Sequence, residues 1–475
     1  LSDSRYEMIG YEGGLKLINF FAVHNIDFNK AWKAKQSGWH DQTRAIFANA
    51  EIGWKSMIYL TATGRNDWDS RLAFSDYKSF FYPSIGLSAI LTSMFNAPDW
   101  LTYLKVRGSY TEVGNSYGRF MTTVTYPYDE QTQSWTSTSS YPNTKLKPER
   151  TKSWEVGLDA RILNDISLNL TYYRSNTYNQ TFYADLSLSS GYSNIPIQSG
   201  NIMNEGLEMS LGYNKQWKDF SFNTNYTLTW NKNRVKRLAD GVYNYATGQP
   251  IQMPELSPLT YGHTDARLIL RVGGSMGDVY GQRLLKRDLN GYILNEEGVG
   301  LAMENKETYL GSILPKMNMG WSLGFGYKGV NLGMTFTGRF GGIVISETQS
   351  VLDAAGVSKV SADVRDAGGV QINQSKVSAQ TYYQTIQGTA AYYTYSATNV
   401  RLGELSLSYT LPKKWFDNKV GMTVGLVGKN LWMIYCKAPF DPELTTSAAS
   451  NFYQGFDAYM LPSTRNFGFN VKFQF

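Results

Sequence analysis

The sequence predicts an all-β fold, a transmembrane antiparallel β-barrel, from three observations. Apolar and polar residues alternate along many segments, short and long connections between these segments alternate, and tryptophans gather at the segment ends. The segment 467–475 is the clearest example, with Phe or Val at every odd position and Gly, Asn, Lys or Gln between them. Because a strand's side chains point to alternate sides, this strand separates an apolar surface from a polar one. Its closing aromatic also resembles the terminal signal read by outer-membrane assembly machinery.

The alternation predicts thirteen strands, and one more is expected within 10–24, which gives about 14 in all. Asn164-Asp165 and Lys328-Gly329 each separate two such runs and are typical of tight hairpin turns. The predicted strands lie at 44–53, 59–68, 79–84, 104–110, 154–162, 166–172, 207–213, 220–230, 317–327, 330–336, 405–411, 420–426 and 467–475.

The connections between these strands fall into two classes that alternate strictly. A membrane barrel has this rhythm, with tight turns at one end and long loops at the other, whereas a soluble sandwich has no reason to keep it. The short connections are 54–55, 94–100, 164–165, 214–218, 328–329 and 412–418, and the long ones are 67–80, 113–148, 179–200, 232–314, 342–396 and 434–461.

Tryptophans mark both ends of the predicted strands. An indole favours the headgroup level of a bilayer, so two belts are expected, and the alternative is that these residues fill a core. Trp54, Trp100, Trp217 and Trp415 accompany short turns, while Trp68, Trp154, Trp230 and Trp432 stand near long loops.

Composition excludes several classes of protein. No run of eighteen apolar residues is present, so membrane-spanning helices are excluded. The single cysteine, Cys436, rules out an intramolecular disulfide framework and a multi-cysteine metal site. The net charge of +6 is spread along the chain without a basic cluster that would indicate nucleic acid. Leu1 opens within what reads as folded sequence, so a C-terminal piece of a longer protein is expected.

Catalytic, cofactor-binding and metal-binding residues are not predicted. The histidines His24, His40 and His263 lack metal-ligand spacing. The Gly-rich segments 273–278 and 338–343 are not followed by a helix in a βαβ setting, so phosphate binding is unsupported. The acidic stretch 288–297 misses the pattern of a calcium loop and is interpreted as a polar turn.

Ligand binding is the better prospect, because the long loops are rich in aromatic residues. Sugar rings stack on such rings while amides and carboxylates bind their hydroxyl groups. The same aromatics would also suit a protein interface, interior packing or an interfacial belt. The predicted substrate-binding residues are Tyr126, Tyr128, Trp135, Tyr382 and Tyr383.

Several segments, in order along nearly the whole chain, resemble the SusC/RagA family of TonB-dependent outer-membrane transporters. The most specific is LKPERTKSWEVGLD at 146–159, which is similar to the L-x-P-E-x-x-x-x-x-E-x-G run common in TonB-dependent receptors. The other matching segments are RAIFANAEIG at 44–53, YLTATGRNDW at 59–68, SFFYPS at 79–84, LKVRGSY at 104–110, NIMNEGLE at 201–208, VRLGELSLSY at 400–409, GKNLW at 428–432, APFDPE at 438–443 and MLPSTR at 460–465.

The resemblance implies a 22-stranded barrel in the bacterial outer membrane, of which residues 1–475 form the C-terminal part. It also implies that the plug domain, the TonB-contacting segment and the first strands are absent from this chain. The resemblance further implies import of oligosaccharides or oligopeptides, powered through the TonB complex, by a protein surrounded by outer-membrane lipid. The implied partner is a SusD-like surface lipoprotein that covers the loops as a lid, in a dimer of barrel–lid pairs.

Other functions stay open at this level. A TonB-dependent siderophore or cobalamin receptor without a lid is the nearest alternative, followed by a passive porin or a structural barrel. A soluble all-β glycan-binding or enzymatic domain is the remaining class. The polar faces of the strands, with Glu155, Asp159, Arg161, Asn169 and Lys472, would line a lumen and serve a solute path or plug contacts.

Overall fold

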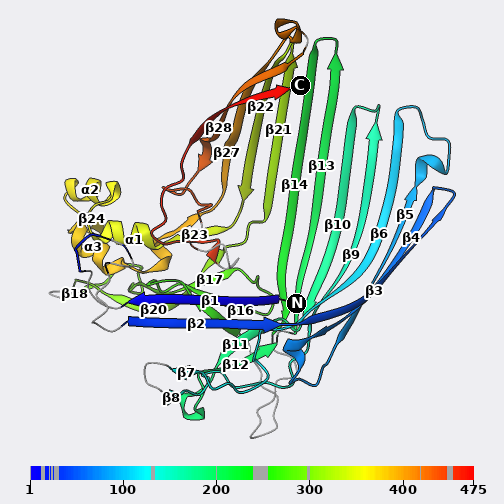
Figure 1. Cartoon of the computed structure of the whole chain (residues 1–475). Helices are drawn as coiled ribbons and strands as arrows, with labels where there is room; N and C mark the ends of the chain where they lie inside the picture. The colour runs from blue at the N-terminus through cyan, green and yellow to red at the C-terminus, as the bar shows by residue number, and fades with distance from the viewer. Residues whose placement is uncertain are drawn as a thin grey trace.

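One large antiparallel sheet of 13 strands dominates the molecule (Figure 1). The computed structural model describes residues 2–11, 16–20, 22, 25, 32–129, 134–198, 200–238, 255–296, 300–417, 419–444, 446 and 453–475. The strands, in order across the sheet, are β3 (Thr43–Trp54), β4 (Ile58–Asp69), β5 (Phe80–Ile90), β6 (Leu101–Asn115), β9 (Glu149–Ile162), β10 (Ile166–Tyr178), β13 (Asn201–Trp217), β14 (Phe220–Arg237), β21 (Met317–Tyr327), β22 (Val330–Phe340), β27 (Asn399–Leu411), β28 (Gly421–Cys436) and β30 (Asn466–Gln474).

All thirteen strands expected from the alternation lie in this sheet, which confirms the all-β prediction. Several run further toward the long connections than predicted, as β13 does by starting at Asn201. The sheet curves and runs from β3 at one edge to β30 at the other, and neighbouring strands in sequence are neighbours in space (Figure 1).

The strand expected within 10–24 is wrong in position. The structure has β1 (Ser2–Tyr11) paired with β2 (Trp32–Asp41) as a separate two-stranded sheet, and residues 16–20 form bends and turns. Residues 12–15, 21, 23 and 24 of the expected segment lie outside the described residues. Residues 2–11 lack a regular apolar alternation, so periodicity had no signal by which to locate this strand.

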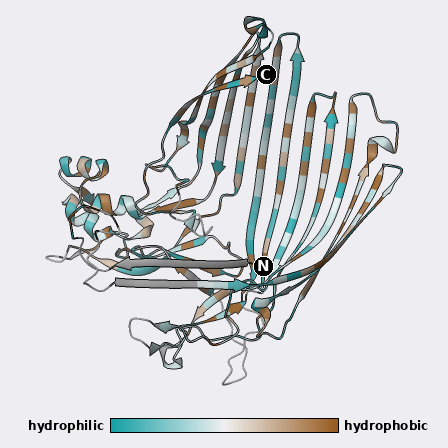
Figure 2. Cartoon of the chain, in the orientation of Figure 1, coloured by the Kyte–Doolittle hydropathy of each residue, from teal (hydrophilic) through white to brown (hydrophobic). Residues whose placement is uncertain are grey.

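The two faces of the sheet differ in polarity. Directly paired residues point to the same side of a sheet, so the pairing shows which residues share a face. Leu407 pairs with Leu426, and Leu426 pairs with Phe469, so these apolar side chains lie side by side. They are 48%, 64% and 80% exposed in the chain. Their sequence neighbours Ser408, Gly425 and Asn470 form the matching row on the opposite face. Brown and teal segments alternate along the strands accordingly (Figure 2).

The tryptophans named as belt candidates all lie on the surface. Their exposed fractions run from 36% at Trp230 to 62% at Trp415, so none of them fills a core. This exposure agrees with two aromatic belts, one near each end of the strands.

The short connections lie at the upper end of the sheet in Figure 1, and those at β9–β10 and β21–β22 are tight turns. Both central residues have positive φ in the two-residue β21–β22 turn (Lys328, 44° and Gly329, 88°), and in the three-residue β9–β10 turn Leu163 (52°) and Asn164 (62°) have positive φ. Positive φ at both positions matches the right-handed twist of paired strands, so the predicted hairpins are confirmed.

The long connections fold into smaller units at the lower end of the sheet (Figure 1). The largest is a four-stranded sheet within the β14–β21 connection, and three short helices lie in the β22–β27 connection. These elements are β7 (Tyr128–Asp129), β8 (Ser134–Trp135), β11 (Thr181–Asp185), β12 (Asn194–Gln198), β15 (Glu255–Thr260), β16 (Arg267–Arg271), β17 (Asp278–Leu285), β18 (Asn295–Glu296), β19 (Gly300–Leu301), β20 (Met303–Ser312), β23 (Ile343–Ser346), α1 (Glu347–Ala354), α2 (Lys359–Asp366), β24 (Val370–Ile372), β25 (Ser375–Val377), α3 (Ala379–Ile386), β26 (Thr394–Ser396) and β29 (Phe456–Asp457).

Most fully buried apolar residues belong to these units rather than to the large sheet. One cluster joins Leu268 of β16 and Val279 of β17 to Ile345 of β23 and Phe456 of β29, so three connections share one core. No helix in the described ranges is long and apolar enough to cross a membrane.

Candidate functional site

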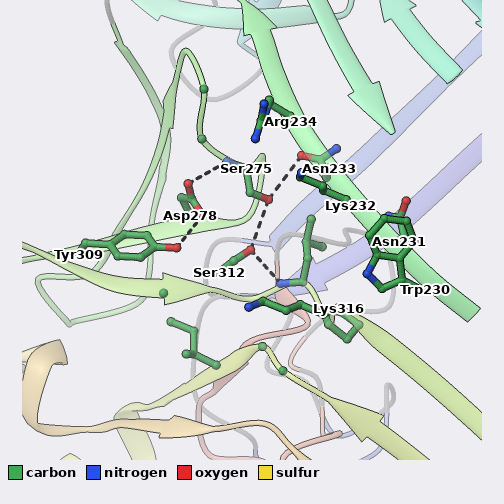
Figure 3. Close-up of a pocket in the computed structure, with 18 residues that line it drawn as sticks. Trp230, Asn231, Lys232, Asn233, Arg234, Ser275, Asp278, Tyr309, Ser312 and Lys316 are labelled. Carbon is green, nitrogen blue, oxygen red and sulfur yellow. Dashed lines mark hydrogen bonds between the residues drawn. The ribbon is translucent and has the colours of Figure 1, made fainter. Parts of the chain in front are cut away.

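A cavity of about 670 Å³ lies where β14 extends beyond the end of its neighbour β21 (Figure 3). The β14–β21 pairing ends at Trp230 opposite Met317, while β14 stays paired with β13 up to Arg237. Beyond Trp230, the free edge of β14 faces loop segments instead of a strand, and the cavity fills this step. Its volume is in the range of ordinary small-molecule sites.

Backbone hydrogen bonds flank the cavity on two sides. At one end, the Asn231 N–H donates to the Lys316 carbonyl at 3.1 Å. At the other end, the Val235 N–H donates to the Gly274 carbonyl, and the Gly273 N–H donates back to Val235, both at 2.8 Å. The opening is therefore held between fixed backbone on two sides.

The Gly-rich segment 273–278 forms one wall of the cavity. Gly273 has a φ of +90°, and a Cβ on Gly274 would lie 2.7 Å from Asp278 Oδ2. The glycines thus permit a tight turn in which the Ser275 N–H donates to that carboxylate at 2.8 Å. The sequence pattern singled out this segment but gave it no role, because a phosphate loop needs a following helix.

Polar side chains link the cavity walls in one network (Figure 3). The Asn233 Oδ1 accepts from the Met276 N–H at 2.7 Å and from the Ser275 hydroxyl at 3.4 Å. The Ser312 hydroxyl donates to Ser275 Oγ at 3.4 Å, and the Tyr309 hydroxyl donates to Asp278 Oδ1 at 3.1 Å. Amide, hydroxyl and carboxylate groups therefore surround the space, as hydroxyl-rich or peptide ligands require.

The charges at the cavity are mostly positive. Arg234 and Lys316 have no ion-pair partner within the described ranges, and Lys232 lies 3.9 Å from Glu205. Asp278 is the buried carboxyl of the site, and burial raises its pKa above the usual value despite its two hydrogen bonds. Burial, together with this carboxylate, raises the pKa of Tyr309 to about 12.

The predicted substrate-binding residues fall into two separate groups. Trp135 of β8 packs on Tyr128 of β7 with ring centres 5.1 Å apart, and Tyr126 lies just before β7. Their exposed fractions are 70%, 48% and 62%, so these three rings are accessible from solvent. Whether they contact a ligand stays a prediction.

Tyr382 and Tyr383 lie on α3 within another apolar cluster. Their rings meet edge to face at 5.2 Å, and Tyr383 is only 6% exposed among residues such as Leu285 and Ile386. Burial raises the pKa of both phenols. This placement favours the packing alternative for Tyr383, and a ligand role of either residue stays a prediction.

A buried ion pair ties the β28–β30 connection to the start of β27. Arg401 donates two hydrogen bonds to the Asp441 carboxylate, at 2.7 and 3.0 Å, and two to Asn399 Oδ1. Asn399 in turn donates to Glu443 at 3.1 Å. The segments VRLGELSLSY and APFDPE, quoted separately from the sequence, thus meet in space, which no spacing could have revealed.

The acidic stretch 288–297 starts as a polar turn and, where it is described, ends in β18. Asp288 Oδ1 accepts from the N–H groups of Asn290 and Tyr292 at 2.9 and 2.8 Å, so its carboxylate is engaged by local backbone. Within the described part of the chain, no cluster of three or more His, Cys, Asp or Glu residues has the geometry of a metal site.

Comparison with known proteins gives a consistent result. Residues 19–431 match the family model described as "TonB dependent receptor-like, beta-barrel". TonB-dependent receptor P3 of Formosa agariphila is 24% identical over an alignment of 513 residues, gaps included. The alignment covers 98% of this chain and 50% of that protein. TonB-dependent receptor SusC of Bacteroides thetaiotaomicron is 25% identical over 243 residues, covering 50% of this chain and 22% of SusC.

A solved structure of the RagAB peptide importer in its open-open state has a similar fold. The TM-score is 0.72 at 20% identity, over 99% of this chain and 51% of the matched chain. The closed-closed state gives a TM-score of 0.73. The chain spans about half the length of the curated relatives that it matches over most of its length.

Proposed function

The chain belongs to the TonB-dependent receptor-like β-barrel family, and on this premise we propose that it is part of a SusC-like importer. Its strands lie in the bacterial outer membrane, where this family resides. We propose that the chain forms the C-terminal part of a 22-stranded barrel, with the plug domain supplied by the rest of the protein. The imported solute is an oligosaccharide or an oligopeptide.

The observation that carries this proposal is the match to SusC-like proteins in sequence, together with a sheet whose long connections all fold at one end. Such folded connections offer a broad platform for a SusD-like surface lipoprotein, which would enclose the solute as a lid. Energy would come through the TonB complex. The family is one of transporters, and we propose that this protein is likewise not an enzyme.

The step cavity and the exposed aromatic group give the proposal candidate contacts. Amides and hydroxyls at the β14 edge, together with Lys316, suit hydroxyl-rich solutes or peptide carboxylates. The rings of Tyr126, Tyr128 and Trp135 offer stacking surfaces for sugars or side chains. Of the two tyrosines on α3, only Tyr382, which is less buried than Tyr383, would contact the solute.

The first test identifies the partner. The protein is purified from native outer membranes in mild detergent, and its stoichiometric partners are identified by mass spectrometry. A SusD-like lipoprotein in equal amount is the expected result and directs the ligand search to oligosaccharides and oligopeptides. A barrel that purifies alone would overturn the proposal in favour of a siderophore or cobalamin receptor, or of a passive pore.

The second test addresses the aromatic group. Trp135→Ala is expected to weaken solute binding and solute-dependent growth in the complete complex, whereas Trp135→Phe retains much of both because a ring remains. Trp415→Ala is the matched control, since this indole is similarly exposed but lies at the short-turn end. Equal binding by wild type and Trp135→Ala would remove Trp135 from the site.

A further inference from the structure

A band of basic residues lies on the apolar face of the sheet, just beyond the aromatic belt. The register places Trp154 of β9 opposite Arg174 of β10, Arg174 opposite Glu205 of β13, and Glu205 opposite Lys232 of β14. One row across four adjacent strands thus begins with an indole and continues with charged side chains.

This row is on the face that meets lipid. Tyr172 precedes Arg174 by two residues, and it pairs with Val156 on one side and Leu207 on the other. Leu207 in turn pairs with Trp230, which precedes Lys232 by two residues. Residues two apart on a strand share a face, so the cations continue the same surface as these apolar side chains.

Further charges lie beyond this row on β9 and β14. Lys152 precedes Trp154 by two residues and Arg150 precedes it by four, and Arg234 follows Lys232 by two, so all share the lipid-facing side. The facing carboxylates are Glu112 of β6, 3.2 Å from Arg150 and 3.3 Å from Lys152, and Glu205 of β13, 3.9 Å from Lys232.

The basic band remains accessible and positively charged. The side chains of Arg150, Lys152 and Lys232 are 38%, 44% and 47% exposed, against 11% for Glu112 and 20% for Glu205. Arg174 and Arg234 are half-buried and have no ion-pair partner in the described ranges. The cations outnumber the carboxylates, and the carboxylates are the more buried partners.

The height of the band matches the headgroup layer. A strand rises about 3.3 Å per residue and tilts by roughly 40° in a membrane barrel, so two residues raise a side chain by about 5 Å. Indoles mark the boundary of the hydrocarbon, and the polar layer beyond it is about 5–8 Å thick. Lys232, two residues beyond Trp230, and Lys152, two residues beyond Trp154, therefore lie where lipid phosphates are found.

We propose that this band, formed by Arg150, Lys152, Arg174, Lys232 and Arg234, binds the phosphate groups of lipid headgroups in the outer leaflet. Guanidinium and ammonium groups bind phosphate through charge-assisted hydrogen bonds, and basic sites beside membrane-spanning elements bind anionic headgroups. The occupant is a lipid because the band continues the apolar face that its acyl chains would cover.

The test compares phosphorylated and dephosphorylated lipid. The purified protein complex in non-ionic detergent is titrated with bis-phosphorylated lipid A, and bound lipid is counted by native mass spectrometry. Wild type is expected to bind the phosphorylated form at least tenfold more tightly than the dephosphorylated form, with a preference that falls as salt rises. Excess inorganic phosphate should not displace the lipid. Equal binding of the two lipid forms would overturn the proposal.

A charge-removal variant localises the site. Lys152→Gln, Arg174→Gln and Lys232→Gln combined should abolish most of the preference for phosphorylated lipid. The matched control, Lys218→Gln, Lys328→Gln and Lys413→Gln, removes as many cations at the short-turn end and should keep it. Heat-modifiable gel mobility checks that both barrels are folded. A control that loses the preference equally would place the lipid site elsewhere, and the wild-type comparison stands even if a variant fails to fold.

Discussion

Arg401 shows how one side chain fixes a connection that the strand pattern leaves undetermined. Its side chain is 10% exposed and meets Asp441, itself 9% exposed, through a two-point contact that a lysine could not make. Burial alone raises the pKa of Asp441, but the hydrogen bonds from Arg401 and from the Glu443 N–H outweigh it, so the pKa lies below its usual value. The pair therefore stays charged under physiological conditions.

Removing Arg401 is expected to be costly because it leaves a buried carboxylate without its partner. Arg401→Ala should destabilise the folded protein by about 3–5 kcal/mol. The measurement is the free energy of urea-induced unfolding in detergent. Lys359→Ala is the control, because the Lys359–Asp363 pair on α2 is 85% and 63% exposed and should change stability little. Similar values for both variants would contradict the role given to Arg401.

Asp278 should give the cavity a measurable pH dependence. Because burial raises its folded-state pKa, the proton is held more tightly in the folded protein than in the unfolded chain. The resulting stabilisation is fully present below the ordinary aspartate pKa and is lost as pH rises through the folded value. Asp278→Asn removes this titration.

The melting temperature of wild type relative to Asp278→Asn should therefore fall between pH 3 and pH 7. Asp417→Asn serves as the control of equal charge change, since Asp417 lies in a short turn away from the cavity. A wild-type-minus-variant difference that is constant over this range would contradict the burial argument.

At the residue scale, the sequence indicated which side chains were candidates for binding but not whether they are buried or exposed in the fold. The loop aromatics were visible as candidates, yet only the structure separates the exposed Trp135 from the buried Tyr383. The basic band was likewise hidden, because Lys152, Arg174 and Lys232 are far apart in sequence and meet only through the register of the strands.

At the element scale, strands were predictable because their pattern is local. Apolar alternation has a period of two and needs only a few residues to be recognised, so every strand of the large sheet was found. The pair β1–β2 was missed since its pairing joins Ser2 to Asp41 and carries no such pattern. The small sheets of the connections were missed for the same reason.

The β21–β22 turn gives a prediction at this scale. Gly329 has a φ of +88°, and an added Cβ would lie 2.7 Å from the Thr410 carbonyl oxygen of the next hairpin. Gly329→Val should therefore combine backbone strain of about 1–3 kcal/mol with a clash against fixed backbone. The loss of stability is measured as a lower midpoint temperature of the heat-induced shift in gel mobility.

Gly291→Val separates the two contributions. Gly291 has a similar φ of +86°, but nothing lies within 4 Å of its added Cβ. This variant should therefore show strain alone and lose less stability than Gly329→Val. An equal loss at both positions would mean that the contact with Thr410 is relieved without cost.

At the scale of the whole molecule, the large sheet has two exposed sides and little core of its own. Its apolar side is stable only against lipid, whereas its folded connections carry buried clusters such as that around Leu268 and Ile345. The sequence could predict that division from the rhythm of short and long connections. It could not predict which connections share a core, since such contacts join β16, β23 and β29 across long stretches of chain.

Neighbouring residues of one strand test that division directly. Leu407 lies in the apolar row with Leu332 and Leu426, and Ser408 lies on the opposite face of β27. Leu407→Arg should lower the free energy of unfolding into urea from lipid vesicles by about 2–4 kcal/mol, because a cation then faces hydrocarbon. Ser408→Arg places the same side chain one residue on, toward the polar side, and should cost much less. If the two variants were equally stable, or if Ser408→Arg were the less stable of the two, the apolar face would not be the one that meets the membrane.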